Sequence, residues 1–109
     1  MFTKEILMSM FKKNKSHNFV IYTNIGRGKG INGVSFESFV GESSEENHII
    51  KGFADSYVII EKTDSGPYLT GAKKDIYLPY EQIVRVDFIT DVKSKFYNFS
   101  GKHILKEIK

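Results

Sequence analysis

The sequence predicts a small, mainly β domain, a strongly bent barrel of five or six short strands preceded by one α-helix. Three observations carry this prediction: an amphipathic stretch at the start, short β-branched and aromatic runs from residue 18 onward, and turn-forming residues between them. Short strands at close spacing favour a small barrel over a parallel sheet. Such a barrel fills its interior with its own side chains, so we expect no buried cofactor.

The helix is expected over residues 3–15. Its apolar side chains recur at the spacing of one helical face, at Phe2, Ile6, Leu7, Met10 and Phe11. Thr3 suits the N-cap, Glu5 suits the first turn, and lysines at 12, 13 and 15 suit the last turn. We expect this amphipathic helix to dock on its own domain.

Six strands are expected after the helix, over residues 19–23, 34–40, 48–53, 57–61, 76–78 and 83–89. A tight turn at residues 54–56 and a connection at residues 79–82 join the later strands, and residues 63–75 read as a surface loop. Residues 1–90 would form the domain, and residues 91–109 a basic, aromatic tail. Ile104, Leu105 and Ile108 would give that tail one or two helical turns.

Composition excludes several classes of protein. The chain has 109 residues and no cysteine, which rules out a disulfide scaffold, a thiol nucleophile and a Cys-ligated metal. Its net charge of +3 is uneven, because residues 1–30 carry six basic and one acidic side chain, and residues 31–61 carry one basic and six acidic. Residues 6–11 are too short an apolar run for a signal peptide or a membrane span, so we expect a cytoplasmic protein without membrane contact.

Motifs for catalysis, nucleotides and metals are missing from the sequence. The glycine-rich stretch of residues 26–33 leads into a strand, whereas a dinucleotide or P-loop motif leads into a helix. The histidines His17, His48 and His103 lack metal-ligand spacing, and we expect them on the surface or on edge strands. We therefore expect no catalytic residues, no metal, no cofactor and no enzyme activity.

Aromatic residues interleaved with basic ones are the strongest functional signal. Aromatic faces stack on bases while cations contact phosphates, so this mixture suits single-stranded nucleic acid. We expect Phe53, Tyr77 and Phe88 in the core, and Tyr57 and Tyr80, beside turns, to be free to stack. The cations predicted to contact RNA are Arg27, Lys29, Lys73, Lys74 and Arg85.

Two segments resemble the motifs of the Sm-like family, whose bacterial members include the Hfq-like RNA chaperones. Residues 50–61 resemble the first motif, in which a strand ending in glycine and an aromatic residue passes through an Asp-containing turn into an aliphatic strand. Residues 78–86 resemble the second motif. The resemblance implies a bent five-stranded barrel whose subunits pair into a ring that binds uridine- or adenine-rich RNA. It implies that Asp55 and Tyr57 lie near the pore, with Tyr57 stacking on a base, and that Tyr80 belongs to the second half of the pocket.

The pocket residues depart from the family pattern. Val58 stands where the family has Asn, and Pro79-Tyr80 stands where it has Arg-Gly, or Lys-His in the bacterial chaperone. An SH3-like barrel fits the same order of strands. The leading hypothesis is a non-catalytic protein that binds single-stranded RNA as a homo-oligomeric ring. The alternative is a protein-interaction or assembly module without nucleic acid, which uses the acidic loop 42–46 and the aromatic tail as contact surfaces.

Overall fold

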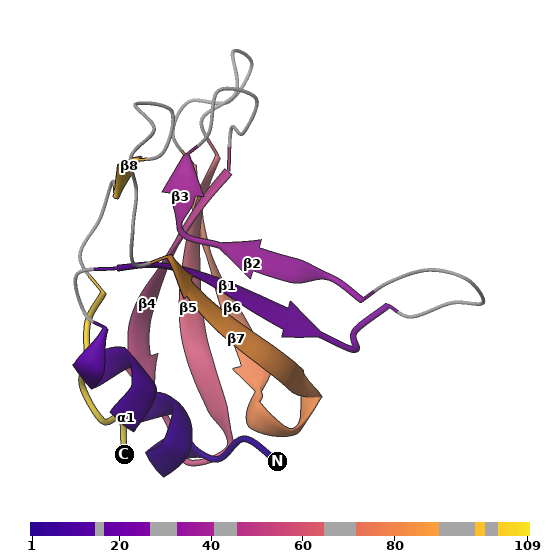
Figure 1. The fold of residues 1–109 in the computed structure, drawn as a ribbon, viewed down its shortest axis with the longest axis vertical. Coiled ribbons are helices and arrows are strands. Elements are labelled where there is room, and N and C mark those ends of the chain that lie inside the picture. Colours follow the sequence, from indigo (N-terminus) through magenta and orange to yellow (C-terminus); the bar gives the residue numbers. More distant parts are fainter. Residues whose placement is uncertain (15–16, 27–32, 41–45, 65–71, 90–97, 100–102) are drawn as a thin grey trace.

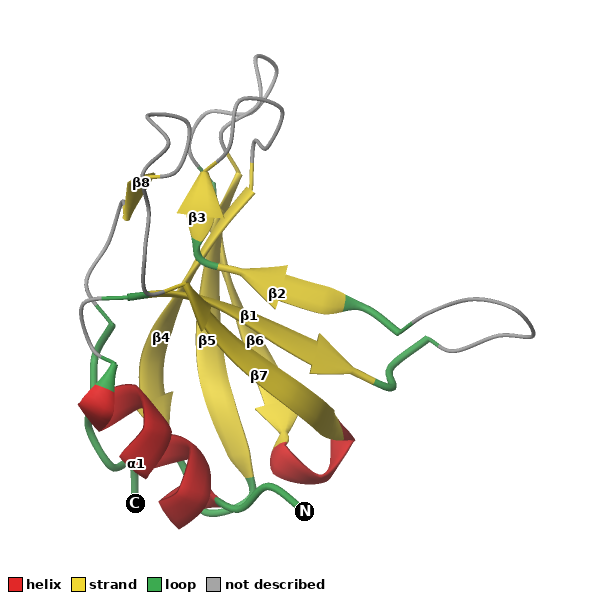
Figure 2. Cartoon of the chain, viewed as in Figure 1, coloured by secondary structure: helices red, strands yellow, loops and turns green. Residues whose placement is uncertain are grey.

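A computed structural model describes residues 1–14, 17–26, 33–40, 46–64, 72–89, 98–99 and 103–109. The order of elements is one α-helix followed by strands, six of which form two three-stranded antiparallel sheets. Figure 1 shows the helix beside the lower ends of the strands, and Figure 2 marks the strands in yellow. The expectation of a small, mainly β domain with an N-terminal helix is confirmed.

Helix α1 spans Lys4–Lys13, close to its expected range. The Thr3 hydroxyl accepts a hydrogen bond from the Ile6 backbone N–H at 3.2 Å, which confirms Thr3 as the N-cap. Leu7 and Phe11 are fully buried. The apolar face of α1 therefore docks on its own domain, as its periodicity predicts.

The first sheet has the strand order β2–β1–β7, with β1 at Asn18–Thr23, β2 at Ser35–Glu37 and β7 at Ile83–Ile89. Both pairings are antiparallel, and Ile21 of β1 lies between Phe36 of β2 and Val86 of β7. A separate small pair joins β3, at Phe39–Val40, to β8, at Asn98–Phe99.

The second sheet has the strand order β4–β5–β6, with β4 at Glu46–Phe53, β5 at Tyr57–Asp64 and β6 at Lys73–Pro79. The 3₁₀ helix η1 spans Tyr80–Gln82 and joins β6 to β7. Both pairings are antiparallel, and a bulge in β4 lies between Ile50 and Gly52.

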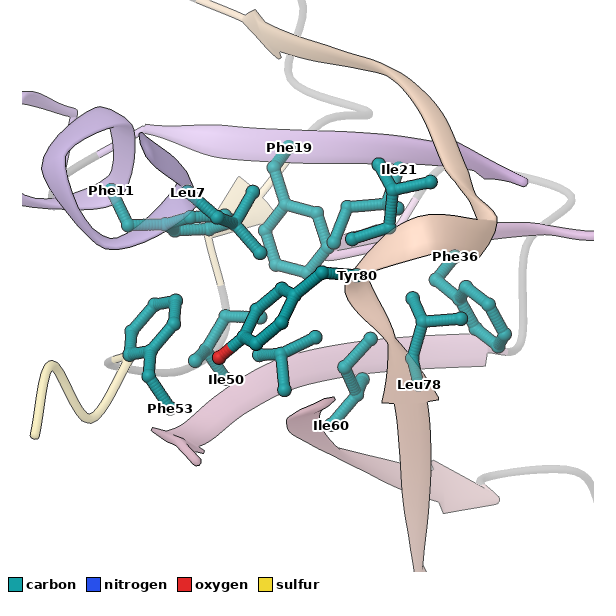
Figure 3. Packing of buried hydrophobic residues seen from close by; sticks show 12 residues of the cluster. Leu7, Phe11, Phe19, Ile21, Phe36, Ile50, Phe53, Ile60, Leu78 and Tyr80 are labelled. Carbon is teal, nitrogen blue, oxygen red and sulfur yellow. The ribbon is translucent and has the colours of Figure 1, made fainter. Parts of the chain in front are cut away.

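Side chains from α1 and both sheets meet in one core (Figure 3). The Phe11 ring lies edge-on to Phe19 and Phe88 of the first sheet, with ring centroids 5.1 and 5.0 Å apart. It also contacts Phe53 of the second sheet, with centroids 6.0 Å apart. Phe11 therefore joins the two sheets to the helix, and edge-to-face rings of this kind add to the burial of apolar surface.

Two finer expectations about the strands were wrong. The expected strand over residues 34–40 breaks at Ser38, whose hydroxyl accepts the Phe19 backbone N–H at 2.7 Å, and β2 and β3 pair with different partners on either side. The expected loop over residues 63–75 is partly strand, because Thr63 of β5 pairs with Lys73 of β6. The polar ends of β5 and β6, around Thr63 and Lys73, lack the alternation of apolar and polar residues that would predict a strand from the sequence.

Within the described residues, the two three-stranded sheets do not close into a barrel. No strand pairing joins β6 to β7, or β4 to the first sheet. In place of the expected closed barrel, this part of the chain forms two antiparallel sheets around one core.

The end of the chain is extended, so the expected helical turns at Ile104, Leu105 and Ile108 were wrong. Residues 103–109 run beside β4, and a parallel bridge joins Phe53 to Glu107. Backbone hydrogen bonds to a strand edge replace those of a helix. This end of the predicted tail packs against the domain.

Candidate functional site

The described residues of the predicted RNA site lie in four separate places. Arg27 and Lys29 lie outside the described residues. Tyr57, Lys73 and Lys74 belong to the second sheet, whereas Asp55 lies in the turn between β4 and β5. The remaining residues are Tyr80 in η1 and Arg85 on β7.

The solvent-facing side of the β4–β5–β6 sheet carries a pair of tyrosines, of which Tyr77 is exposed and Tyr57 is half-buried. The rings of Tyr57 and Tyr77 lie edge-on, with centroids 5.2 Å apart, and Tyr77 is 58% exposed. Ile59 pairs with Tyr77 across the strands. We call this surface the tyrosine face, and it consists of Lys51, Tyr57, Ile59, Glu61, Lys73, Asp75 and Tyr77.

Lysines and carboxylates alternate along the tyrosine face. The Lys51 ammonium lies 3.1 Å from Asp75 and 3.5 Å from Glu61, and the Lys73 ammonium lies 3.7 Å from Glu61. The hydrogen bond to Asp75 raises the pKa of Lys51 above its ordinary value. Two cations and two anions therefore balance on this face, and Lys74, on the next position of β6, is exposed.

Tyr77 and Tyr80 have exchanged the places that the sequence predicts for them. Tyr80 is 5% exposed and lies among the core side chains (Figure 3). Its hydroxyl donates to the Ala54 carbonyl at 2.7 Å. Burial raises the pKa of Tyr80 to about 12. Because Leu78 points inward, its neighbour Tyr77 points outward, and η1 then turns Tyr80 into the core. The Tyr80 ring is thus unavailable for stacking on a base.

Asp55 is exposed but belongs to an ion-pair cluster with the start of α1. The Lys4 ammonium, whose side chain is only 10% exposed, lies 2.8 Å from Asp55 and 2.6 Å from Glu107. The hydrogen bond from Lys4 lowers the pKa of Asp55 below its ordinary value, and the hydrogen bonds to the two carboxylates raise the pKa of Lys4. A shallow hollow of about 320 Å³ lies beside the cluster, between the start of α1, the turn at Ser56 and η1.

Arg85 lies on β7, on the other sheet from the tyrosine face. Its guanidinium donates two hydrogen bonds to the Asp87 carboxylate, at 2.8 and 2.6 Å. The same group lies 4.8 Å from the centre of the Tyr22 ring. Arg85 is therefore engaged with its own sheet and does not join the tyrosine face.

The sequence did not point to the residues that hold the C-terminal segment against β4. The Ile104 N–H donates to the Ile50 carbonyl at 2.7 Å. The Phe53 N–H donates to the Lys106 carbonyl at 2.8 Å, and the Ile108 N–H donates to the Phe53 carbonyl at 2.7 Å. A sequence signal exists in retrospect, because Gly52 interrupts an otherwise bulky strand and glycine in a strand marks a close approach.

Two of the three histidines are buried: His48 lies on the edge strand β4, as expected, whereas His103 lies in the core, against the expectation of a surface or edge-strand position. His103 is 8% exposed and lies against the rings of Phe11 and Phe19, with centroids 5.6 and 5.0 Å away. Its Nδ1 accepts the Ile50 N–H at 3.3 Å, and burial lowers its pKa to about 4. His48 is 3% exposed, and its Nδ1 lies 2.8 Å from the Glu37 carbonyl. Ring contacts and the strand backbone hold these residues inside.

The described part of the chain holds little further chemistry. There, no three metal-ligating side chains gather, and no helix is long and apolar enough to cross a membrane. Comparison of the chain with models of protein families, with curated proteins and with solved structures found no match in any of the three.

Proposed function

We propose that the two sheets are an open form of a small Sm-like or SH3-like barrel. Strand β1 pairs with β7, so the first strand of the set lies beside the last. Helix η1 makes the tight connection from β6 to β7, at the place where the resemblance puts the second motif. The shared core supports the barrel proposal, because side chains of both sheets and of α1 pack into a single cluster.

We propose that the domain binds single-stranded RNA without catalysis and that the tyrosine face is the contact surface. The observation that carries this proposal is the pair Tyr57 and Tyr77 on an open sheet face. Bases stack readily on aromatic rings that stand on a sheet. Lys73 lies on the same face of β6 as Tyr77 and suits a contact to phosphate, whereas Lys74 is exposed at the neighbouring position of that edge strand.

Charge on the tyrosine face limits the contribution of phosphates. Glu61 and Asp75 neutralise Lys51 and Lys73 locally, so stacking supplies most of the affinity in this proposal. Each phosphate contact releases counterions, so affinity should still fall as salt rises.

The test is the anisotropy of a short, fluorescently labelled uridine-rich or adenine-rich RNA at low and at moderate salt. Stacking on one ring is worth about 1–3 kcal/mol, so Tyr77→Ala should weaken binding by about tenfold. Tyr22→Ala is the matched control, because Tyr22 also lies beside a basic side chain but on the other sheet. Equal effects of the two substitutions, or no RNA binding at low salt, would contradict the proposal.

A second candidate function is protein assembly, and the free edge of β7 favours it. In the described structure, β7 pairs only with β1. Such edges accept strands from other chains. Val84, on β7, is also 55% exposed.

Light scattering at low salt tests assembly directly. A homo-oligomer that Val84→Lys breaks and Ile6→Lys leaves intact would support it, since Ile6 is a similarly exposed aliphatic residue on α1. A monomer would exclude assembly and leave RNA binding to be judged by its own test.

A further inference from the structure

The outer edge of β4 is a strand-accepting site that the chain fills with its own end. Three backbone hydrogen bonds of 2.7, 2.8 and 2.7 Å connect residues 104–108 to Ile50 and Phe53. The segment runs parallel to β4, with α1 close by (Figure 1). Main-chain bonds of this kind bind any extended peptide, and side-chain pockets then decide which one.

Two features of the edge select side chains. The Lys4 ammonium binds the Glu107 carboxylate at 2.6 Å, so one position of the bound strand is acidic. Gly52 has no side chain, and a methyl group there would overlap Ile108. The space over Gly52 therefore accepts a branched aliphatic residue at the position of the bound strand that follows the acidic one. Leu105 packs against the core and adds an aliphatic position two residues before the acid.

Lys4 has a second partner besides the docked segment, because its ammonium also lies 2.8 Å from Asp55. Glu107 and Ile104 are partly exposed in the docked state, at 46% for the Glu107 side chain and 42% for Ile104. A competing strand would have to replace three backbone hydrogen bonds and the packing of His103 on the Phe11 and Phe19 rings.

The docked segment competes from within the same chain. Phe88, near the end of β7, and His103, at the start of the docked segment, both contact the Phe11 ring, with centroids 5.0 and 5.6 Å away. Between them in sequence, Phe99 of β8 pairs with Phe39 of β3. A partner peptide therefore competes with a segment that is covalently attached to the site.

We propose that the β4 edge beside α1 is a binding site for an extended peptide of a partner protein. The peptide has an aliphatic residue, any residue, an acidic residue and a branched aliphatic residue in succession. Leu105-Lys106-Glu107-Ile108 is the internal copy of this pattern and competes with the partner. Charge complementarity to Lys4 and the space over Gly52 define the partner.

The test measures binding of a fluorescently labelled synthetic peptide with the sequence of residues 103–109 to full-length chains. Glu107→Lys in the chain loosens the internal competitor and should lower the apparent Kd of the peptide about tenfold, because the site is then free more of the time. Glu81→Lys is the control, since it makes the same charge change at an exposed residue of η1.

Two further measurements make the outcome decisive. Gly52→Val, combined with Glu107→Lys and checked for folding by circular dichroism, should abolish binding of the peptide. A peptide carrying lysine in place of its glutamate should bind at least tenfold more weakly than the original. Equal binding to the Glu107→Lys and Glu81→Lys chains, or undiminished binding after Gly52→Val, would overturn the proposal.

Discussion

The two edges of the β4–β5–β6 sheet differ in what they carry and in what covers them. The β4 edge holds Gly52 and receives residues 103–109, which run beside it and form one parallel bridge, between Phe53 and Glu107. The β6 edge holds the exposed residues Lys73, Lys74 and Asp75, and no described strand pairs with it.

The difference shows how side chains decide the fate of an edge. Charged side chains, lysine above all, discourage an incoming strand, whereas a glycine allows close approach. In this sheet, the β6 edge is unpaired and its charged side chains discourage pairing, whereas the β4 edge is occupied by residues 103–109. The filled edge depends on Gly52, Lys4 and the aromatic core beneath it, and each can be changed separately.

Loss of the Phe11 ring should have the largest effect. Phe11→Ala removes a fully buried ring that contacts both sheets and His103, so we expect unfolding to become easier by about 3–5 kcal/mol. Urea denaturation measures this loss. A cost below about 1 kcal/mol would mean that α1 does not support the filled edge.

Acid should release the filled edge before the open face changes. His103 has its pKa lowered from 6.5 to about 4 by burial, so the docked state excludes the proton that the undocked state takes up. Docking is then fully stable above pH 6.5 and loses about 3 kcal/mol as pH falls to 4. The loss is measured as the protection of the Ile104 amide, which is its exchange rate relative to the unstructured rate at the same pH. In His103→Gln this protection should depend less on pH. An unchanged profile in that variant would assign the effect to other groups.

A methyl group on Gly52 should undock the segment without unfolding the domain. Gly52→Ala creates an overlap with Ile108, and overpacking of this kind costs about 1–3 kcal/mol. Adding Ile108→Ala removes the overlap and should restore part of the protection of the Ile104 amide. Two single effects that simply add in the double variant would show that residues 52 and 108 do not touch.

Charge removal on the open face should have the smallest effect. Lys73 is exposed and its ion pair with Glu61 is long, at 3.7 Å, so Lys73→Gln should leave the urea midpoint unchanged. The same variant should weaken RNA binding and reduce its salt dependence. A large loss of stability would show that the ion pairs of the tyrosine face hold the sheet together.

Local signals in the sequence predicted most elements of the fold. Thr3 predicted where α1 begins, and the spacing of the apolar residues predicted which side of α1 is buried. Strand β7 has the predicted bounds of residues 83–89. The ends of β5 and β6 escaped prediction, because the pairing of Thr63 with Lys73 is a tertiary contact between polar residues. The break at Ser38 likewise depends on its bond to Phe19, a residue distant in sequence.

The candidate sites were harder to predict than the fold. Tyr57, which we expected to be free at the surface, is half-buried beside Tyr77. Tyr77 and Tyr80 exchanged their expected places because η1 changes the direction of the chain. The docking of residues 103–109 depends on contacts with β4 and α1 that span most of the chain. No local pattern encodes the partnership of Lys4 with Glu107.

The filled β4 edge is tested most directly by amide hydrogen exchange of the unmodified chain at neutral pH. The amides of Ile104 and Ile108, which donate to β4, should exchange far more slowly than the amides of an unstructured chain. Both should lose this protection together in Gly52→Val, while the Ile60 amide in the sheet centre keeps it. Exchange of Ile104 and Ile108 at unstructured rates in the unmodified chain would show that the β4 edge is not filled by residues 103–109.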